Sequence, residues 1–219
     1  MSEYVRPVLP QQVFYDADGA VIDYGNRWQG MSPPDDTYSV VTNPERFAPL
    51  HAVAGALIEY LIRAFVADAL ENSSVVEDFI HPPDDIARAV RIVPSDPAAA
   101  PMTFAFTNHP GLGVHAGLLH DFWFPDCGCD ACDESLESAA EELESTVIAV
   151  TEGGYTESVG GISPLSLLGL NVGYELDSSN GRRRSHRTRG DLLPQDRLMA
   201  AREQLRRLRD GWQPWTRRA

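Results

Sequence analysis

The feature that most constrains the fold is a long stretch of helical apolar periodicity from Pro49 to about Ala69. Apolar residues recur in it at three- and four-residue spacing, so they share one helix face that another layer must bury. Asn43 and Pro44, an N-cap and N1 pair, precede this stretch. We therefore predict a central helix over about 49–69. Its buried face consists of Leu50, Val53, Ala54, Leu57, Leu61, Ile62 and Phe65.

The covering layer is predicted to be a sheet. Short apolar and β-branched runs at 90–93, 102–107, 113–116 and 118–124 indicate strands. Asp133 is placed to cap a second helix over about 133–151, with acidic residues at its positive N-terminal end. Helices and strands do not alternate regularly. The pattern favours an α+β fold, with a mostly antiparallel sheet packed against two helices, over a doubly wound sheet.

Weaker patterns complete the expected secondary structure. Asp16–Gly19 lies between two short apolar runs, as in a β-hairpin. Further strands are expected at 38–41 and 165–176, a short helix at 84–89, and a last helix from about 194 to 210.

The charged residues divide the chain into two parts. Residues 1–181 contain 6 arginines and 28 acidic residues, whereas 182–219 contain 12 arginines and 4 acidic residues, and the net charge is −14. We expect an acidic α+β domain at 1–180, followed at 181–219 by an Arg-rich linker and a C-terminal helix. The run Arg182–Arg189 lacks apolar spacing and is expected to be mobile. The two parts are expected to attract each other.

This composition excludes several functions. The chain contains no lysine, so it has no P-loop lysine, Schiff-base lysine or kinase strand lysine. An acidic body repels nucleic acid, so nucleic-acid binding is expected at most weakly, through the Arg182–Arg189 tail. No apolar run is long enough to span a membrane and the N-terminus does not resemble a signal peptide, so a soluble, cytoplasmic protein is expected.

Three thiols lie close together in the segment between the strand at 118–124 and the helix at 133–151. Cys127, Cys129 and Cys132 form a C-x-C-x2-C pattern, in which Gly128 permits a tight backbone turn. Such a loop can direct three thiolates at one thiophilic metal, and zinc takes four ligands in structural sites. We predict a structural zinc. The candidate fourth ligands are His120 and, as alternatives, His115 and His109.

Two other interpretations of the cysteines stay open. They could be inert, partly buried thiols. Cys129 and Cys132 could also be a redox pair, because the following helix N-terminus lowers thiol pKa values. The neighbouring acidic residues Asp126, Asp130 and Asp133 oppose thiolate formation unless a metal is bound.

A second candidate site is the pair Arg27 and Trp28, which either lines a site or forms a cation–π contact in a loop. The segment 24–28 (YGNRW), the segment 44–51 (PERFAPLH) and the run 127–134 (CGCDACDE) together resemble an uncharacterised actinobacterial family of unknown function. The resemblance spans roughly residues 12–176, does not clearly include the Arg-rich tail, and implies no activity.

Three functions remain in competition. The first is a non-catalytic, protein-binding or regulatory module with a structural zinc, which chelation would unfold. The second is an enzyme, either a thiol redox protein or a zinc-dependent hydrolase using the same cysteines. The third is an acidic inhibitor or immunity-type protein that occupies a basic site on its partner. The sequence favours the first.

Overall fold

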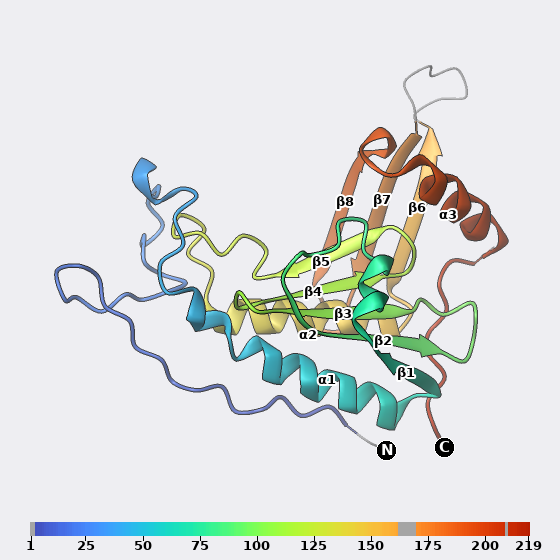
Figure 1. The fold of residues 1–219 in the computed structure, drawn as a ribbon, viewed down its shortest axis with the longest axis horizontal. Helices are drawn as coiled ribbons and strands as arrows, with labels where there is room; N and C mark the ends of the chain where they lie inside the picture. Colours follow the sequence, from blue (N-terminus) through green and yellow to red (C-terminus); the bar gives the residue numbers. More distant parts are fainter. Residues whose placement is uncertain (1–2, 162–169, 209) are drawn as a thin grey trace.

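A computed structural model describes residues 3–161, 170–208 and 210–219 (Figure 1). It is an α+β fold, as predicted, with an antiparallel five-stranded sheet, a second sheet of three strands and three α-helices. The five-stranded sheet has the order β1-β2-β3-β4-β5. Its strands are β1 (Ala67–Glu71), β2 (Ile86–Pro94), β3 (Met102–Thr107), β4 (Gly111–Ala116) and β5 (His120–Phe124).

Two helices, α1 (Leu50–Ala64) and α2 (Leu136–Thr151), cover this sheet and enclose the main core (Figure 1). The predicted apolar face of the central helix is confirmed through Leu61, because Leu50, Leu57 and Leu61 are fully buried there. Residues Pro44–Ala64 are long and apolar enough to cross a membrane by length and composition alone, but half of that segment is buried inside the protein. It is therefore the core helix of this fold.

Several predicted boundaries were wrong. The central helix ends at Ala64, because Phe65 is extended and β1 begins two residues later. Residues 86–89 of the expected helix at 84–89 belong to β2, where pairing with β3 supplies a hydrogen-bonded ladder that overrides local helix signals. The segment 38–41 forms turns and irregular structure, and the hairpin at Asp16–Gly19 is reduced to a turn closed by one bridge between Tyr15 and Val21.

The second sheet corrects the prediction for the basic run. Its strands are β6 (Tyr155–Gly161), β7 (Leu170–Asp177) and β8 (Arg183–Arg189), in that order. The Arg-rich segment is therefore a paired edge strand, in register with β7 along seven residues. The predicted strand at 165–176 corresponds to β7, and its part at 165–169 lies outside the described residues.

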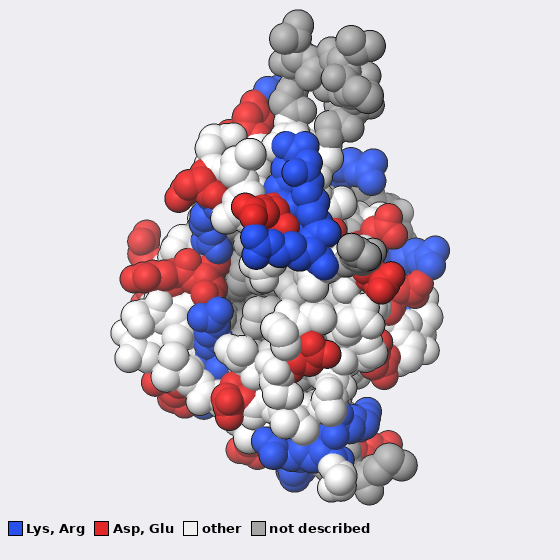
Figure 2. All heavy atoms as spheres, turned by 90° about the vertical axis from the view of Figure 1, so that its right-hand side faces the viewer, with Lys and Arg blue, Asp and Glu red and all other residues white. Residues whose placement is uncertain are grey.

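The C-terminal part folds back onto the rest of the chain. The last helix, α3 (Gln195–Arg207), packs on β6, and Trp212 and Trp215 lie in the main core. Arg182 pairs with Glu141 at 2.6 Å, and Arg184 pairs with Glu142. Figure 2, which faces the α3 side, shows arginine and acidic side chains interspersed. The expected attraction between the two parts of the chain is thus seen as ion pairs that join Arg182 and β8 to α2.

The N-terminal segment is an arm without a core of its own. It runs along α1 and then forms loops beside the segment between β5 and α2 (Figure 1). None of residues 3–45 is buried, and short 3-10 turns at Asp35–Thr37 and Pro44–Phe47 are its regular structure. Near its start, Arg6 pairs with Glu144 on α2. The arm is therefore held by contacts to other elements rather than by its own packing.

Candidate metal centre

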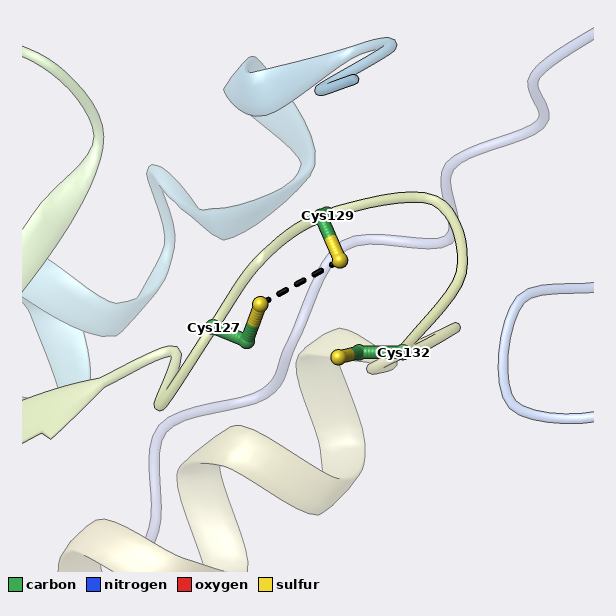
Figure 3. A group of neighbouring side chains, drawn as sticks. All are labelled: Cys127, Cys129 and Cys132. Atoms are coloured by element: carbon green, nitrogen blue, oxygen red, sulfur yellow. Dashed lines mark hydrogen bonds between the residues drawn. The ribbon is translucent and has the colours of Figure 1, made fainter. Parts of the chain in front are cut away.

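The three cysteines converge in the segment between β5 and α2, which we call the cysteine loop (residues 125–134). Their sulfur atoms all lie within 4.8 Å of one another. Cys127 Sγ and Cys129 Sγ are 3.2 Å apart, and Figure 3 shows the Cys132 side chain pointing toward the same space. Cys127 and Cys132 are exposed, whereas Cys129 is buried. The predicted cluster is therefore assembled, with an outer side open to solvent.

The backbone of the loop is built for this convergence. Gly128 has a φ of 73°, the left-handed region that glycine adopts without strain. A Cβ atom at this position would lie 3.0 Å from the ring of Pro125. A side chain at position 128 would therefore disturb the turn that brings the first two thiols together.

The cysteine loop is hydrogen-bonded to the N-terminal arm. Asp130 N donates to Val40 O at 2.8 Å, and Ala131 N donates to Thr37 O at 3.1 Å. The buried Asp130 carboxylate accepts from the backbone N–H of Thr42 at 3.0 Å and from its hydroxyl. These bonds attach the part of the arm at 37–42 to the loop that carries the cysteines.

Arg27 and Trp28, in the N-terminal arm, contact the same cysteine loop. The Arg27 guanidinium stacks on the Trp28 ring at 4.7 Å, and Trp28 Nε1 donates to Asp130 O at 3.2 Å. Arg27 N donates to the Asp133 carboxylate at 2.7 Å. The cation–π contact is therefore present, and the pair is a further attachment of the arm to the cysteine loop. This explains why Asp133 does not cap α2: that helix is capped by Ser135 in a capping box with Ser138.

Arg46 was missed as a functional residue. Its guanidinium is buried and donates to Thr42 O at 2.6 Å and to Gly128 O at 3.0 Å, so it joins the arm to the cysteine loop. It also packs between the rings of Tyr24 and Phe47. Burial lowers the pKa of Arg46, and neighbouring acidic groups counteract this effect. The sequence pointed to Arg46 only through its place in the segment 44–51 (PERFAPLH), to which no role had been assigned.

Comparison with known proteins agrees with the resemblance noted from the sequence. A family of unknown function, DUF6226, matches residues 10–219. The chain belongs to this family. The match includes the Arg-rich C-terminal part, which the sequence resemblance did not clearly reach. No curated protein and no solved structure matches the chain.

The electrostatics of the DUF6226 cysteine loop differ from the expectation that nearby acids oppose thiolate formation. A hydrogen bond from Cys127, helped by backbone N–H groups of Cys132 and Ser39, lowers the pKa of Cys129 to about 7. The pKa of Cys132 is raised to about 12 because its thiol hydrogen-bonds to Cys127 and Cys129. In the metal-free cluster, Cys129 is therefore the thiol that ionises first, and Cys132 keeps its proton to higher pH.

The structure does not bring the predicted histidines to the cysteines. Among the described residues, the close group of metal-ligand atoms consists of the three sulfurs. His120 begins β5, roughly 13 Å along the strand from its end at Phe124. Its Nδ1 lies 2.8 Å from Glu157, and His115 Nδ1 lies 2.7 Å from Asp121.

His109 is exposed in the turn between β3 and β4, at the same end of the sheet as the cysteine loop. Its backbone N–H donates to Asp85. Of the three predicted histidines, His109 is the one that lies at the end of the sheet next to the cysteine loop.

The donor set suits a thiophilic metal. Thiolates are soft ligands that select zinc and related ions, and a compact loop with one readily ionised thiol favours binding. Beside the sulfurs, the Glu134 carboxylate accepts hydrogen bonds from the backbone N–H groups of Asp126 and Cys127. Burial raises the pKa of Glu134, and the backbone N–H groups of Asp126 and Cys127 partly offset this rise.

Proposed function

We propose that Cys127, Cys129 and Cys132 bind a structural zinc ion that fixes the N-terminal arm to the core. The protein is then a non-catalytic binding or regulatory module. The observation that carries this proposal is the position of the sulfur cluster, in a loop whose backbone and side chains hold the arm. A metal that rigidifies this loop would organise a segment with no core of its own.

The first step of the argument is energetic. The arm has no buried residue between positions 3 and 45, so apolar burial contributes little to its ordering. Hydrogen bonds to Asp130, Ala131 and Asp133 supply its attachment instead. Those bonds keep their geometry only while the cysteine loop keeps its shape.

The second step concerns coordination. Three sulfur ligands leave one position of a tetrahedral zinc site to be filled. We propose that solvent, His109 after a side-chain rearrangement, or a group from a bound partner occupies it. The exposure of Cys127 and Cys132 supports this proposal, because it leaves the site accessible from outside.

The test is the metal content of the reduced, full-length protein, purified without a metal-binding tag. We expect about one zinc per chain, lost in Cys127→Ser and in Cys129→Ser. His120→Asn, which changes a distant predicted ligand, should keep the metal. Wild-type protein free of stoichiometric metal would refute the proposal.

A second candidate, thiol redox chemistry, is favoured by one observation. The pKa of Cys129 is about 7, and Cys127 Sγ lies 3.2 Å away as a thiol that could resolve an oxidised Cys129. Oxidation would join these two sulfurs in a disulfide, with release of two protons and transfer of two electrons to a thiol-specific oxidant such as oxidised glutathione. Metal-free protein that forms no such disulfide with oxidised glutathione would exclude this function.

We further propose that the partner of the module is a protein in the reducing cytoplasm. Three free cysteines support that compartment, and the net charge of −14 favours a partner with a basic surface. Binding that does not weaken with added salt would contradict a charge-driven association.

A further inference from the structure

A cavity of about 310 Å³ lies between the edge strand β5 and the second sheet, away from the cysteine loop. It is lined by residues from β5, β7 and β8 and from the segments before β2 and α3. Most of its wall is apolar, including Leu119, Trp123, Val172 and Leu193. A cavity of this size holds a bicyclic organic molecule, since roughly half the volume suffices for benzene.

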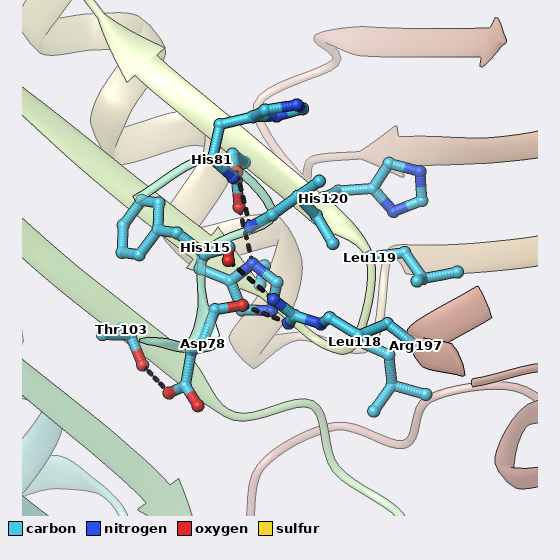
Figure 4. Close-up of polar contacts among 12 residues, drawn as sticks. Asp78, His81, Thr103, His115, Leu118, Leu119, His120 and Arg197 are labelled. Atoms are coloured by element: carbon cyan, nitrogen blue, oxygen red, sulfur yellow. Dashed lines mark hydrogen bonds and ion pairs between the residues drawn. The ribbon is translucent and has the colours of Figure 1, made fainter. Parts of the chain in front are cut away.

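One wall is fixed by buried polar contacts. The Asp121 carboxylate accepts from the backbone N–H groups of Ile80 and His81, at 2.9 and 3.1 Å, and contacts His115 Nδ1. From the opposite side, Arg197 on α3 donates to the carbonyl groups of Asp78 and Phe79 (Figure 4). The segment carrying Ile80 and His81 is thereby held in place before any ligand arrives.

His120 supplies a directed polar group in this cavity. The side chain of Glu157 is fully buried and accepts hydrogen bonds from the backbone N–H groups of Leu118 and Leu119 and from Trp212 Nε1. These three donors make Glu157 an acceptor, so His120 Nδ1, at 2.8 Å, must donate to it. This fixes the ring tautomer and leaves Nε2 as the free nitrogen.

His120 Nε2 has no hydrogen-bond partner among the described residues, and the ring borders the cavity. The Asp121 carboxylate, the other strongly polar group of the wall, already accepts three hydrogen bonds. The remaining side chains of the lining with imidazole or hydroxyl groups are His81, Tyr174, His186 and Thr188. Apart from Asp121, the polar side chains of the lining are therefore mainly imidazoles and two hydroxyls, on an otherwise apolar surface.

We propose that this cavity is a binding site for a small apolar molecule carrying a carboxyl group, anchored on His120 Nε2. A carboxyl group suits Nε2 in either protonation state. As an acid it donates its O–H to the neutral ring. As a carboxylate it accepts N–H from the protonated ring, whose charge Glu157 balances from the other side. The apolar walls receive the rest of the molecule. None of these residues belongs to the cysteine loop.

The test uses 2-naphthoate as a probe and its methyl ester as a matched compound that lacks both the charge and the O–H donor. Calorimetric titration of the full-length protein should show one site per chain, with affinity for the acid at least about tenfold higher than for the ester, as expected for one hydrogen bond to a charged group. Absence of 2-naphthoate binding, or equal affinity for acid and ester, would overturn the proposal.

Variants locate the site. His120→Asn keeps a donor to Glu157 but removes Nε2, and should weaken 2-naphthoate binding about tenfold. Thr188→Trp, at a partly exposed position of the edge strand β8, should abolish binding by filling the cavity without disturbing the core. Glu59→Gln, at an exposed position of α1 outside the cavity, should bind like the wild type. Unchanged affinity in both His120→Asn and Thr188→Trp would place the probe elsewhere and refute the assignment.

Discussion

Arg46 is a buried cation that connects two segments with little apolar surface of their own. Its guanidinium serves the carbonyl groups of Thr42 and Asn43 in the arm, and of Gly128 and Glu134 in the cysteine loop. A planar group with five donors can satisfy several carbonyls at once, which an ammonium group cannot do from the same position.

Arg46→Lys is therefore expected to lower the free energy of unfolding by about 2–3 kcal/mol, because buried carbonyl groups lose their donors. Urea denaturation followed by circular dichroism measures this change. Arg88→Lys is the matched control, because Arg88 pairs with Glu71 at the surface. The stability of this variant should stay close to that of the wild type. Equal effects of both substitutions would show that Arg46 has no special role.

The thiols predict a pH dependence in the metal-free, reduced protein. The pKa of Cys129 is lowered to about 7 from 9.0, so folding is favoured by its ionisation. Stability from this group should rise as the pH increases from about 7 to 9, and be lost as the pH falls through 7. Cys132 acts with the opposite sign between 9 and about 12, because its pKa is raised.

Ultraviolet absorbance of the thiolate measures this directly. We expect the first thiolate to appear with a midpoint near pH 7, and to be missing at that pH in Cys129→Ser. A first midpoint at the ordinary thiol pKa in the wild type would contradict the hydrogen bonding inferred around Cys129.

At the scale of elements, periodic and strongly apolar segments were predictable and their ends were not. The span of β3 was predicted residue for residue, and the central helix was placed correctly except for its C-terminal end. The strand nature of Ile86–Ala89 and of Arg183–Arg189 could not be read locally, because pairing with distant strands decides it. Convergence of the three cysteines followed from their spacing, whereas the contribution of Arg46 depends on contacts far apart in the sequence.

The N-terminal end of α2 gives an element-scale prediction. Ser135 accepts from Ser138 N at 3.1 Å in a capping box, so Ser135→Ala should cost about 1 kcal/mol of stability. Thermal or urea unfolding measures the loss. Ser32→Ala, at an exposed position outside any helix, is the control and should leave stability unchanged. Unchanged stability in Ser135→Ala would contradict capping by Ser135 and favour the cap at Asp133 that was expected from the sequence.

At the scale of the whole molecule, the core and the arm depend on different interactions. The five-stranded sheet, α1 and α2 form the main apolar core, to which the C-terminal residues Trp212 and Trp215 contribute. A smaller cluster joins α3 to β7 through Leu198 and Val172. The start of the arm is held on the core by Tyr4, Arg6 and Leu9, whereas its later part, at 27–42, depends on hydrogen bonds to the cysteine loop. Removal of a metal from the cysteines should therefore release the arm and leave the sheets folded, a more local effect than the complete unfolding expected from the sequence.

Hydrogen exchange of the zinc-loaded and chelated protein tests this central claim most directly. Chelation should abolish protection of the amides that join arm and loop, whereas amides of β3 and β4 should keep theirs. The arm and loop amides are those of Arg27, Thr42, Asp130 and Ala131. Protection at the arm and loop that stays unchanged after the zinc is removed would contradict it.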